Sequence, residues 1–279
     1  MPIPMTPALV ADLERTELRV WSTFYRTAPS PAVVACGIGI QEFGPAAAMW
    51  MSKIDILACN RVLGLGLEGP PDHRVVEAII ATYERAMVPR FFIQLAPLVS
   101  LGPTATAVTD QGFAHYNNWV RLVRDVSPPG PCPSTLRVEE IGRDRAPLLA
   151  EIVCTGFGWS PDLALPIQAM VGTPGWKAYL AYQGDQPVAS AILVVDGRIG
   201  WLGFAATLPD ARGHGAQSSL IARRILDARA AGCEILTVET AEQTPTREAP
   251  SSRNILRAGF EVGYVRPNYL YKFQQRDGA

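Results

Sequence analysis

The sequence predicts an α/β protein of two domains, in each of which helices flank a mixed central sheet. Its 279 residues are nearly twice the length of a typical single domain of ~150 residues. With 48% apolar and 18% charged residues, the chain can bury a sizeable core. Segment 127–134, SPPGPCPS, has four prolines that a helix interior or a central strand does not tolerate. We therefore expect a first domain at 1–126, a linker at 127–134 and a second domain at 135–279.

Strands and helices alternate through the C-terminal half. Asp196-Gly197 predicts a tight hairpin, Gly232 is typical of a helix end, and Leu220, Ile221 and Ile225 recur at helical spacing. We expect strands at 135–141, 177–182, 187–195, 199–207 and 234–239, helices at 146–156, from about 216 to 231 and near 251, and a final pair of strands after Gly259-Phe260.

The N-terminal half shows a similar order with weaker signals. We expect helices at 8–26, 74–86 and 104–111 and strands near 32–40, 47–50, 62–67, 90–95 and 119–123. Both halves end in the order strand, helix, strand, helix, Gly-Phe, strand. We interpret this as a degenerate internal repeat, in which the first half is a diverged, non-catalytic copy of the second.

Charge and cysteine content argue against several classes of protein. Lys and Arg number 25 against 26 Asp and Glu, and a net charge of −1 disfavours a generally basic nucleic-acid binder. The five cysteines include no C-x-x-C pair, which favours free thiols in a reducing cytoplasm over a zinc site. Neither a leader sequence nor a run of ~20 apolar residues is visible. We predict a cytoplasmic protein without a metal and without nucleic-acid or membrane partners.

The segment Pro209–Gln217 carries the strongest chemical signal. It follows a predicted strand, contains two glycines and opens a helix. The first amides of a helix have no intrahelical partner, and the helix dipole adds partial positive charge there. Glycines let phosphate oxygens approach these amides, while Arg212 adds a charge and His214 a donor. The residues alone leave open both a pyrophosphate-binding loop and an ordinary strand–helix turn.

The segment Arg212-Gly213-His214-Gly215-Ala216 resembles the Arg/Gln-x-x-Gly-x-Gly/Ala motif of the GNAT N-acetyltransferases. The element order over 135–273 and the Gly259-Phe260 pair resemble that family too. The resemblance implies acetyl-CoA as co-substrate, with pyrophosphate on the amides of 213–218 and pantetheine where two strands splay. The binding residues it implies are Ala205, Ala206, Thr207, Arg212, Gly213, His214, Gly215, Ala216, Gln217, Ser218 and Asn254.

Two positions depart from the family pattern. Gln217 replaces the last Gly/Ala of the motif, and Ile255 stands where the family has the tyrosine that protonates the leaving thiolate. Tyr269 and Tyr271 on the last strand are substitute acids, with packing as the alternative. Glu239 ends the strand after the glycine-loop helix and is a candidate base, directly or through water; a solvated strand-end charge is the alternative.

A second glycine pattern, Gly64–Gly69, fits G-x-G-x-x-G but not a dinucleotide site. Pro70 and Pro71 separate it from the next helix, and the following strand ends without an acidic residue. We therefore expect one CoA per chain, bound by the second half.

The function predicted is acetyl transfer from acetyl-CoA to a primary amine of a small molecule or peptide. Amides near Ala205–Thr207 would polarise the thioester carbonyl. The alternative, favoured by Ile255, is a CoA-binding sensor or regulatory module that turns over weakly or not at all. The sequence gives neither the acceptor nor the oligomeric state.

Overall fold

The chain folds into two compact units in a computed structural model that describes residues 3–131, 134, 136–244 and 250–274. The C-terminal unit comprises Met1–Pro4, Thr27–Pro29 and Val120–Tyr264, and the N-terminal unit comprises Met5–Arg26, Ser30–Trp119 and Val265–Ala279. Linker residues 132 and 133 and the first residue of the predicted second domain, 135, lie outside the described residues.

Two long strands make these units differ from the predicted division. Strands β5 (Ala114–Asp125) and β11 (Glu261–Lys272) each run from one unit into the other. The expected pair of strands after Gly259-Phe260 is therefore a single strand of 12 residues. Pro267 lacks an amide donor but does not break β11, because its carbonyl still accepts a bond of 3.1 Å from Leu95 N.

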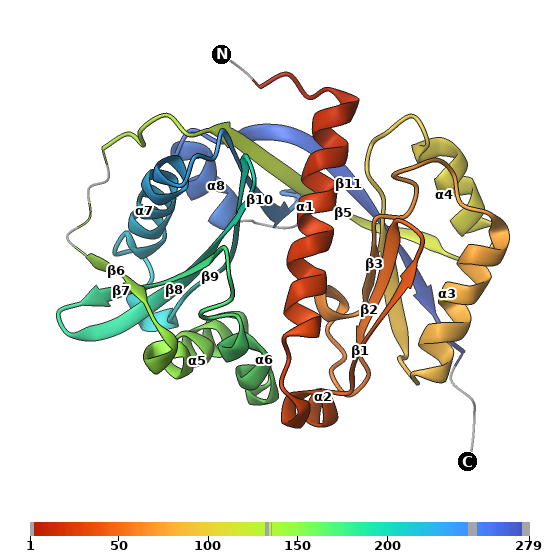
Figure 1. The fold of residues 1–279 in the computed structure, drawn as a ribbon, viewed down its shortest axis with the longest axis horizontal. Helices are drawn as coiled ribbons and strands as arrows, with labels where there is room; N and C mark the ends of the chain where they lie inside the picture. The colour runs from red at the N-terminus through yellow and green to blue at the C-terminus, as the bar shows by residue number, and fades with distance from the viewer. Residues whose placement is uncertain (1–2, 132–133, 135, 245–249, 275–279) are drawn as a thin grey trace. The chain divides into compact units, whose positions relative to one another are not determined.

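The N-terminal unit combines a helical start with a mixed sheet in the order β1-β2-β3-β4-β11-β5. Its remaining elements are α1 (Pro7–Arg26), α2 (Ser30–Cys36), β1 (Ile38–Phe43), β2 (Ala46–Met51), β3 (Arg61–Leu63), α3 (His73–Arg85), β4 (Arg90–Gln94) and α4 (Leu101–Thr109) (Figure 1). The strand expected at 32–40 is wrong in its first part, which is α2. Gly37, at φ +66°, ends that helix before β1.

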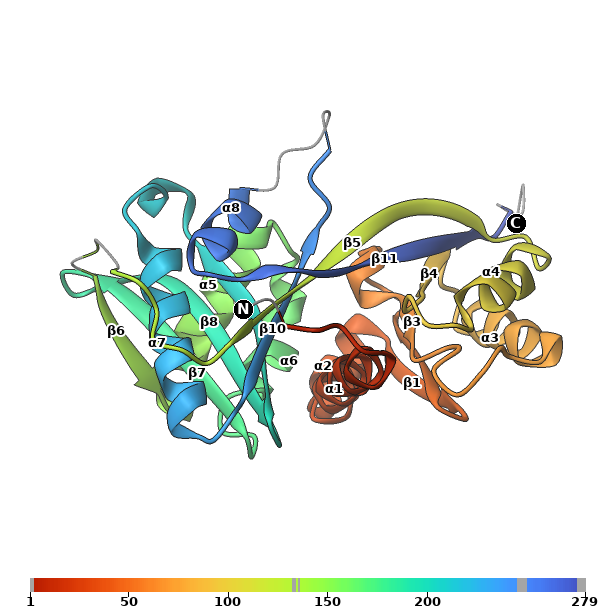
Figure 2. The same ribbon diagram turned by 90° about the horizontal axis from the view of Figure 1, so that it is seen from above.

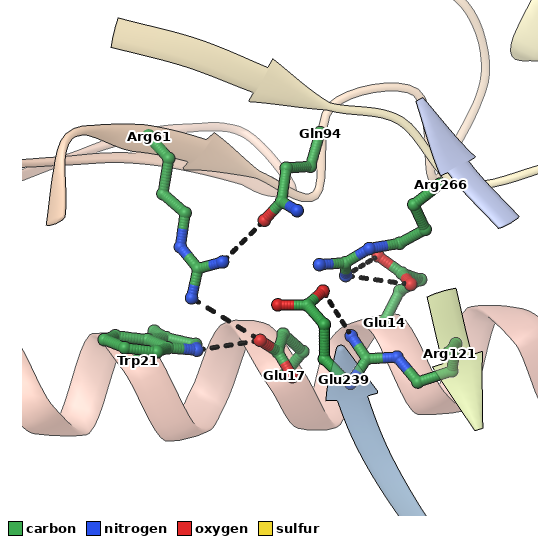
Figure 3. Close-up of polar contacts among 8 residues, drawn as sticks. All are labelled: Glu14, Glu17, Trp21, Arg61, Gln94, Arg121, Glu239 and Arg266. Atoms are coloured by element: carbon green, nitrogen blue, oxygen red, sulfur yellow. Dashed lines mark hydrogen bonds and ion pairs between the residues drawn. The ribbon is translucent and has the colours of Figure 1, made fainter. Parts of the chain in front are cut away.

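Buried ion pairs hold α1 to the strands of the N-terminal unit. Arg61 Nη2 lies 3.5 Å from Glu17 Oε1, and Arg266 Nη1 lies 3.0 Å from Glu14 Oε2 (Figure 3). All four side chains are at most 3% exposed. Burying a charge is costly unless it is paired, so these contacts favour the face that α1 turns to the sheet.

The C-terminal unit has the strand order β11-β5-β10-β9-β8-β7-β6. Its remaining elements are β6 (Arg137–Ile141), α5 (Ala146–Phe157), α6 (Ala164–Ala169), β7 (Trp176–Gln183), β8 (Gln186–Asp196), β9 (Ile199–Thr207), α7 (Ala216–Ala230), β10 (Ile235–Ala241) and α8 (Pro250–Arg257). Strands β6 to β9 are antiparallel, whereas β10 is parallel to β9. Helix α6 is an addition to the predicted elements.

Helices cover both faces of this sheet. Helix α7 packs its Leu220, Ile221 and Ile225 on a core that includes alternate residues of β8, such as Ala191 and Leu193. Helix α5 lies on the opposite face (Figure 2). In the part of the chain that the structure describes, there is no helix long and apolar enough to cross a membrane.

Candidate functional site

The two parallel strands of the C-terminal unit pair only at their beginnings. Their register runs from Ile199 opposite Ile235 to Leu202 opposite Val238. Beyond that point β9 continues to Thr207 and β10 to Ala241 without further pairing between them. The sheet therefore opens between β9 and β10, and main-chain groups on the facing edges become available to a ligand.

A bulge in β9 lies at this opening. On β8, Ile192 and Ser190 are two residues apart, but their partners on β9, Gly203 and Ala206, are three apart. Phe204 within the bulge has φ +47°, a left-handed conformation that costs a non-glycine residue about 1–3 kcal/mol. The bulge takes one residue out of the β8 ladder, so the amides between Phe204 and Ala206 can point at the opening.

The glycine loop, residues 212–215, leads directly into α7. Gly215 is the N-cap at φ +82°, and Gly213 has φ +86°, conformations that favour glycine. Ser219 N bonds Gly215 O at 3.0 Å, the first turn of the helix, which leaves the amides of residues 216–218 without a helical partner. Arg212 Nη2 donates to Gly156 O at 3.2 Å, so its charge stays beside the loop.

A cavity of about 590 Å³ joins the loop to the opened strands. Ten of the eleven residues that the resemblance implies for CoA line it; His214 does not. Asn254 Nδ2 donates to Gln217 Oε1 at 2.7 Å across this cavity's wall. Ser190 also lines this cavity. Its buried Oγ has no hydrogen-bond partner among the described residues.

A smaller cavity of about 160 Å³ adjoins the first and shares Phe157, Ala205, Gln217 and Ser251 with it. Glu239 lines it with a side chain that is 11% exposed. The Glu239 carboxylate lies 3.5 Å from Nη2 of the buried Arg121 (Figure 3). Ile255, in the position of the family's tyrosine, lines the same cavity and is buried. The lining of the smaller cavity therefore includes the carboxylate of Glu239, whereas position 255 contributes an apolar side chain and no hydroxyl.

The two tyrosines predicted as substitute acids lie elsewhere. Tyr269 and Tyr271 belong to the N-terminal unit and pair with β4, opposite Ile93 and Phe91. The ring of Tyr271 lies 5.0 Å from that of Phe113 in an aromatic core. Neither tyrosine lines either cavity of the C-terminal unit. The structure thus brings Glu239 to the opening but not the tyrosines.

Sequence reasoning missed one charged residue of this site. Arg224 on α7 is 2% exposed and lines the smaller cavity. Its Nε donates to Leu220 O and its Nη1 to Ile192 O, both at 3.1 Å. Burial lowers the pKa of the guanidinium to about 10. The available signal was its position on the apolar stripe of α7, four residues after Leu220.

The second glycine pattern, Gly64–Gly69 in the N-terminal unit, does not lead directly into a helix. Gly66 packs against Thr104, whose Oγ1 would lie 2.7 Å from a Cβ at position 66. Helix α3 begins only at His73, after Pro70 and Pro71, and Asp72 caps it by accepting from Arg74 N at 2.9 Å. An acidic cap occupies the helix start and repels phosphate.

Comparisons with known proteins identify the fold. No protein-family model matches the chain, and no curated protein matches it either. Among solved structures, a GCN5-related N-acetyltransferase from Kribbella flavida matches at 14% identity and a TM-score of 0.60, over 88% of this chain and 97% of the other. The predicted fold class is confirmed: a mixed sheet flanked by helices, in the GNAT arrangement.

Two further structures support the same fold. A GCN5-related N-acetyltransferase from Sphaerobacter thermophilus matches at 15% identity and a TM-score of 0.56, over 82% of this chain and 76% of the other. A tandem GNAT protein from the clavulanic acid biosynthesis pathway matches at 14% identity and a TM-score of 0.51, over 74% of this chain and 69% of the other. The tandem protein fits the predicted arrangement of two copies in one chain.

Proposed function

We propose that the protein is an acyltransferase that moves an acyl group from acyl-CoA, with acetyl-CoA as the simplest donor, to a primary amine. The observation that carries the proposal is the cavity of about 590 Å³ between the glycine loop and the opening of β9 and β10. Its lining contains the bulged strand and the loop that follows it, together with Asn254, which lies far from both in the sequence. The fold agrees with this proposal, but a fold alone does not define a function. The cavity therefore carries the argument.

The residues present fit a CoA molecule at this place. The amides of residues 216–218 at the start of α7 would hold the pyrophosphate, with Arg212 adding charge beside them. The edge of Ala205–Thr207 would hold the pantetheine arm. Ser190, whose buried hydroxyl has no partner among the described residues, offers a hydrogen bond to the same ligand.

Acyl transfer at this site needs one bond to form and one to break. The amine nitrogen attacks the thioester carbonyl carbon, a C–N bond forms, and the C–S bond then breaks. An amide of the bulge near Ala205 stabilises the oxyanion, and Glu239 accepts the proton that the amine loses, directly or through water. The thiolate takes its proton from water, because position 255 carries isoleucine. The acceptor is a small molecule or a peptide amine.

The N-terminal unit serves in this proposal as a diverged copy without its own CoA site. Asp72 at the start of α3 and the packing of Gly66 against Thr104 support this role. We therefore expect a stoichiometry of one CoA per chain.

A CoA-binding sensor is a second candidate function, favoured by Ile255 in the small cavity. Two measurements separate the candidates. Calorimetric titration of the full chain with acetyl-CoA tests binding, and a thiol-release assay with a panel of primary amines tests turnover. Amine-dependent thiol release supports the transferase; binding at one site without release for any amine supports the sensor. The absence of binding contradicts both.

A further inference from the structure

The smaller cavity holds polar groups that an acetyl group would leave unused. Beside apolar side chains, its lining contains the polar side chains of Gln217, Arg224, Glu239, Thr240 and Ser251. Its volume of about 160 Å³ is roughly five times the ~30 Å³ share of one water molecule in the liquid. The methyl group of an acetyl donor would therefore fill only a small part of it.

Arg224 lines this cavity as a cation outside any ion pair among the described residues, whereas the Glu239 carboxylate of the same lining is paired with Arg121. A guanidinium has five N–H donors, and the two bonds that Arg224 makes both go to main-chain carbonyls, Leu220 O and Ile192 O. No carboxylate forms an ion pair with it among the residues that the structure describes. A buried charge is costly unless it is paired, so this site is electrostatically complementary to an anionic ligand.

Thr240 provides a second, independent unpaired group. Its side chain is only 9% exposed, and its Oγ1 has no hydrogen-bond partner within the described residues. Val238, two residues earlier on β10, packs against the core beneath α7. Because side chains alternate along a strand, Thr240 shares with Val238 the face of β10 turned to α7, whereas Glu239 lines the same cavity from the other face of the strand.

The two faces of the opening therefore carry different chemistry. On the face opposite α7, Glu239 is paired with Arg121 and suits an amine that must lose a proton. On the α7 face, the Arg224 guanidinium offers hydrogen-bond donors and the Thr240 hydroxyl can also donate. A carboxylate can accept from both, since it has two oxygens and four lone-pair sites, and an Arg–carboxylate pair is among the strongest polar contacts.

We propose that the acyl donor is a CoA thioester of a short dicarboxylic acid, whose free carboxylate binds Arg224 and Thr240 in the smaller cavity. This rests on the proposed function, because it names the acyl group delivered to the same site. A four-carbon diacid is the appropriate probe: beyond its thioester carbonyl it has two methylenes and one carboxylate. The transferred product would carry a free carboxylate on the new amide.

The first experiment uses the wild-type chain and needs no acceptor. Calorimetric titrations compare CoA, acetyl-CoA, succinyl-CoA and 4-methylpentanoyl-CoA, in which two methyl groups replace the carboxylate oxygens of the succinyl group. We expect succinyl-CoA to bind at least tenfold more tightly than 4-methylpentanoyl-CoA. Equal affinities, or tighter binding of the apolar chain, would overturn the inference.

Variants then assign the preference to its residues. Arg224→Met removes the cation at similar length and should abolish the preference for succinyl-CoA, while Arg229→Met, on an exposed position of the same helix, should keep it. Thr240→Val removes only the hydroxyl and should reduce the preference about threefold or more. If Arg224→Met does not fold, the wild-type comparison and Thr240→Val decide. A full preference in a folded Arg224→Met variant contradicts the assignment.

The outcomes separate this inference from the function beneath it. If no CoA derivative binds, the proposed acyltransferase itself fails. If CoA and acetyl-CoA bind but succinyl-CoA gains nothing over its apolar analogue, only the dicarboxylic donor fails. If succinyl-CoA binds preferentially and supports amine-dependent thiol release, both stand.

Discussion

Asn254 Nδ2 donates a hydrogen bond of 2.7 Å to Gln217 Oε1 and so connects α8 to the first turn of α7. This contact explains how the chain accommodates glutamine where the family motif has a small residue. The side chain of Gln217 is engaged by Asn254, which leaves the amide of residue 217 at the start of the helix for a ligand.

The Asn254–Gln217 pair should behave as a coupled unit. We expect Asn254→Ala and Gln217→Ala each to lower the free energy of unfolding by about 1 kcal/mol, the scale of one hydrogen bond. The double variant should lose less than the sum of the two, with a coupling of about 0.5 kcal/mol or more in a denaturation cycle. Strictly additive losses would mean that the contact does not stabilise the fold.

The glycine loop should be intolerant of a negative charge. Gly215 is the N-cap of α7 at φ +82°, and a Cβ there would already approach Ser134 Cβ to 3.0 Å. Gly215→Glu adds strain and a like charge where the pyrophosphate would sit. CoA affinity should fall at least tenfold, which is about 1.4 kcal/mol, in a calorimetric titration.

A matched variant separates the effect of position 215 from the strain and charge that a glutamate adds at any glycine with a positive φ. Gly184 also has a positive φ, lies in the turn between β7 and β8, and has open space around it. Gly184→Glu should therefore lower the stability of the fold without weakening the binding of CoA. If Gly215→Glu folds and binds CoA as tightly as Gly184→Glu does, CoA binds elsewhere.

Glu239 should affect turnover rather than CoA binding. It lines the smaller cavity beside Arg121, with its carboxylate 3.5 Å from the guanidinium. Glu239→Gln keeps the shape but cannot accept the proton, so kcat should fall ~10²-fold or more, the usual contribution of a general base. The titration with acetyl-CoA should change little. A variant with normal kcat and a normal pH–rate profile would remove Glu239 from the mechanism.

The parts of this site that were predictable from the sequence are the local ones. The glycine loop is a contiguous motif between a strand and a helix, so the proximity of residues 212–218 can be predicted without knowing the tertiary fold. The bulge at Phe204 and the opening between β9 and β10 depend on strand register, which no short pattern specifies. Arg224 and Thr240 come from separate elements and meet only at the smaller cavity.

The errors in the predicted fold have similar physical reasons. Pro267 is typical of a strand end, yet it lies within β11 because its carbonyl alone is needed for the bond to Leu95. The apolar run after Ser30 contains β-branched residues typical of a strand, but forms α2. Tyr269 and Tyr271 lie in the N-terminal unit because β11 is one long strand that continues into it, whereas the sequence predicted two strands within the second domain.

The missing acid can be restored to test its role. Ile255 is buried, lines the smaller cavity and stands where the family has tyrosine. In Ile255→Tyr the added ring can extend into the space of about 160 Å³, so the test uses acetyl-CoA, whose methyl group leaves that space free, and the tyrosine hydroxyl can protonate the leaving thiolate. If departure of the thiolate limits the rate, kcat should rise by at least tenfold, up to the ~10²-fold of one general acid.

The control for this restoration is Ile255→Phe, which has the same bulk without the hydroxyl. Filling the cavity in this way can cost about 1–3 kcal/mol of stability by overpacking, and both variants should show that cost equally in thermal unfolding. A gain in thiol release with the tyrosine but not with the phenylalanine assigns the effect to the proton. Equal rates for the two variants would show that water already supplies the proton fast enough, and that the isoleucine at 255 does not limit turnover.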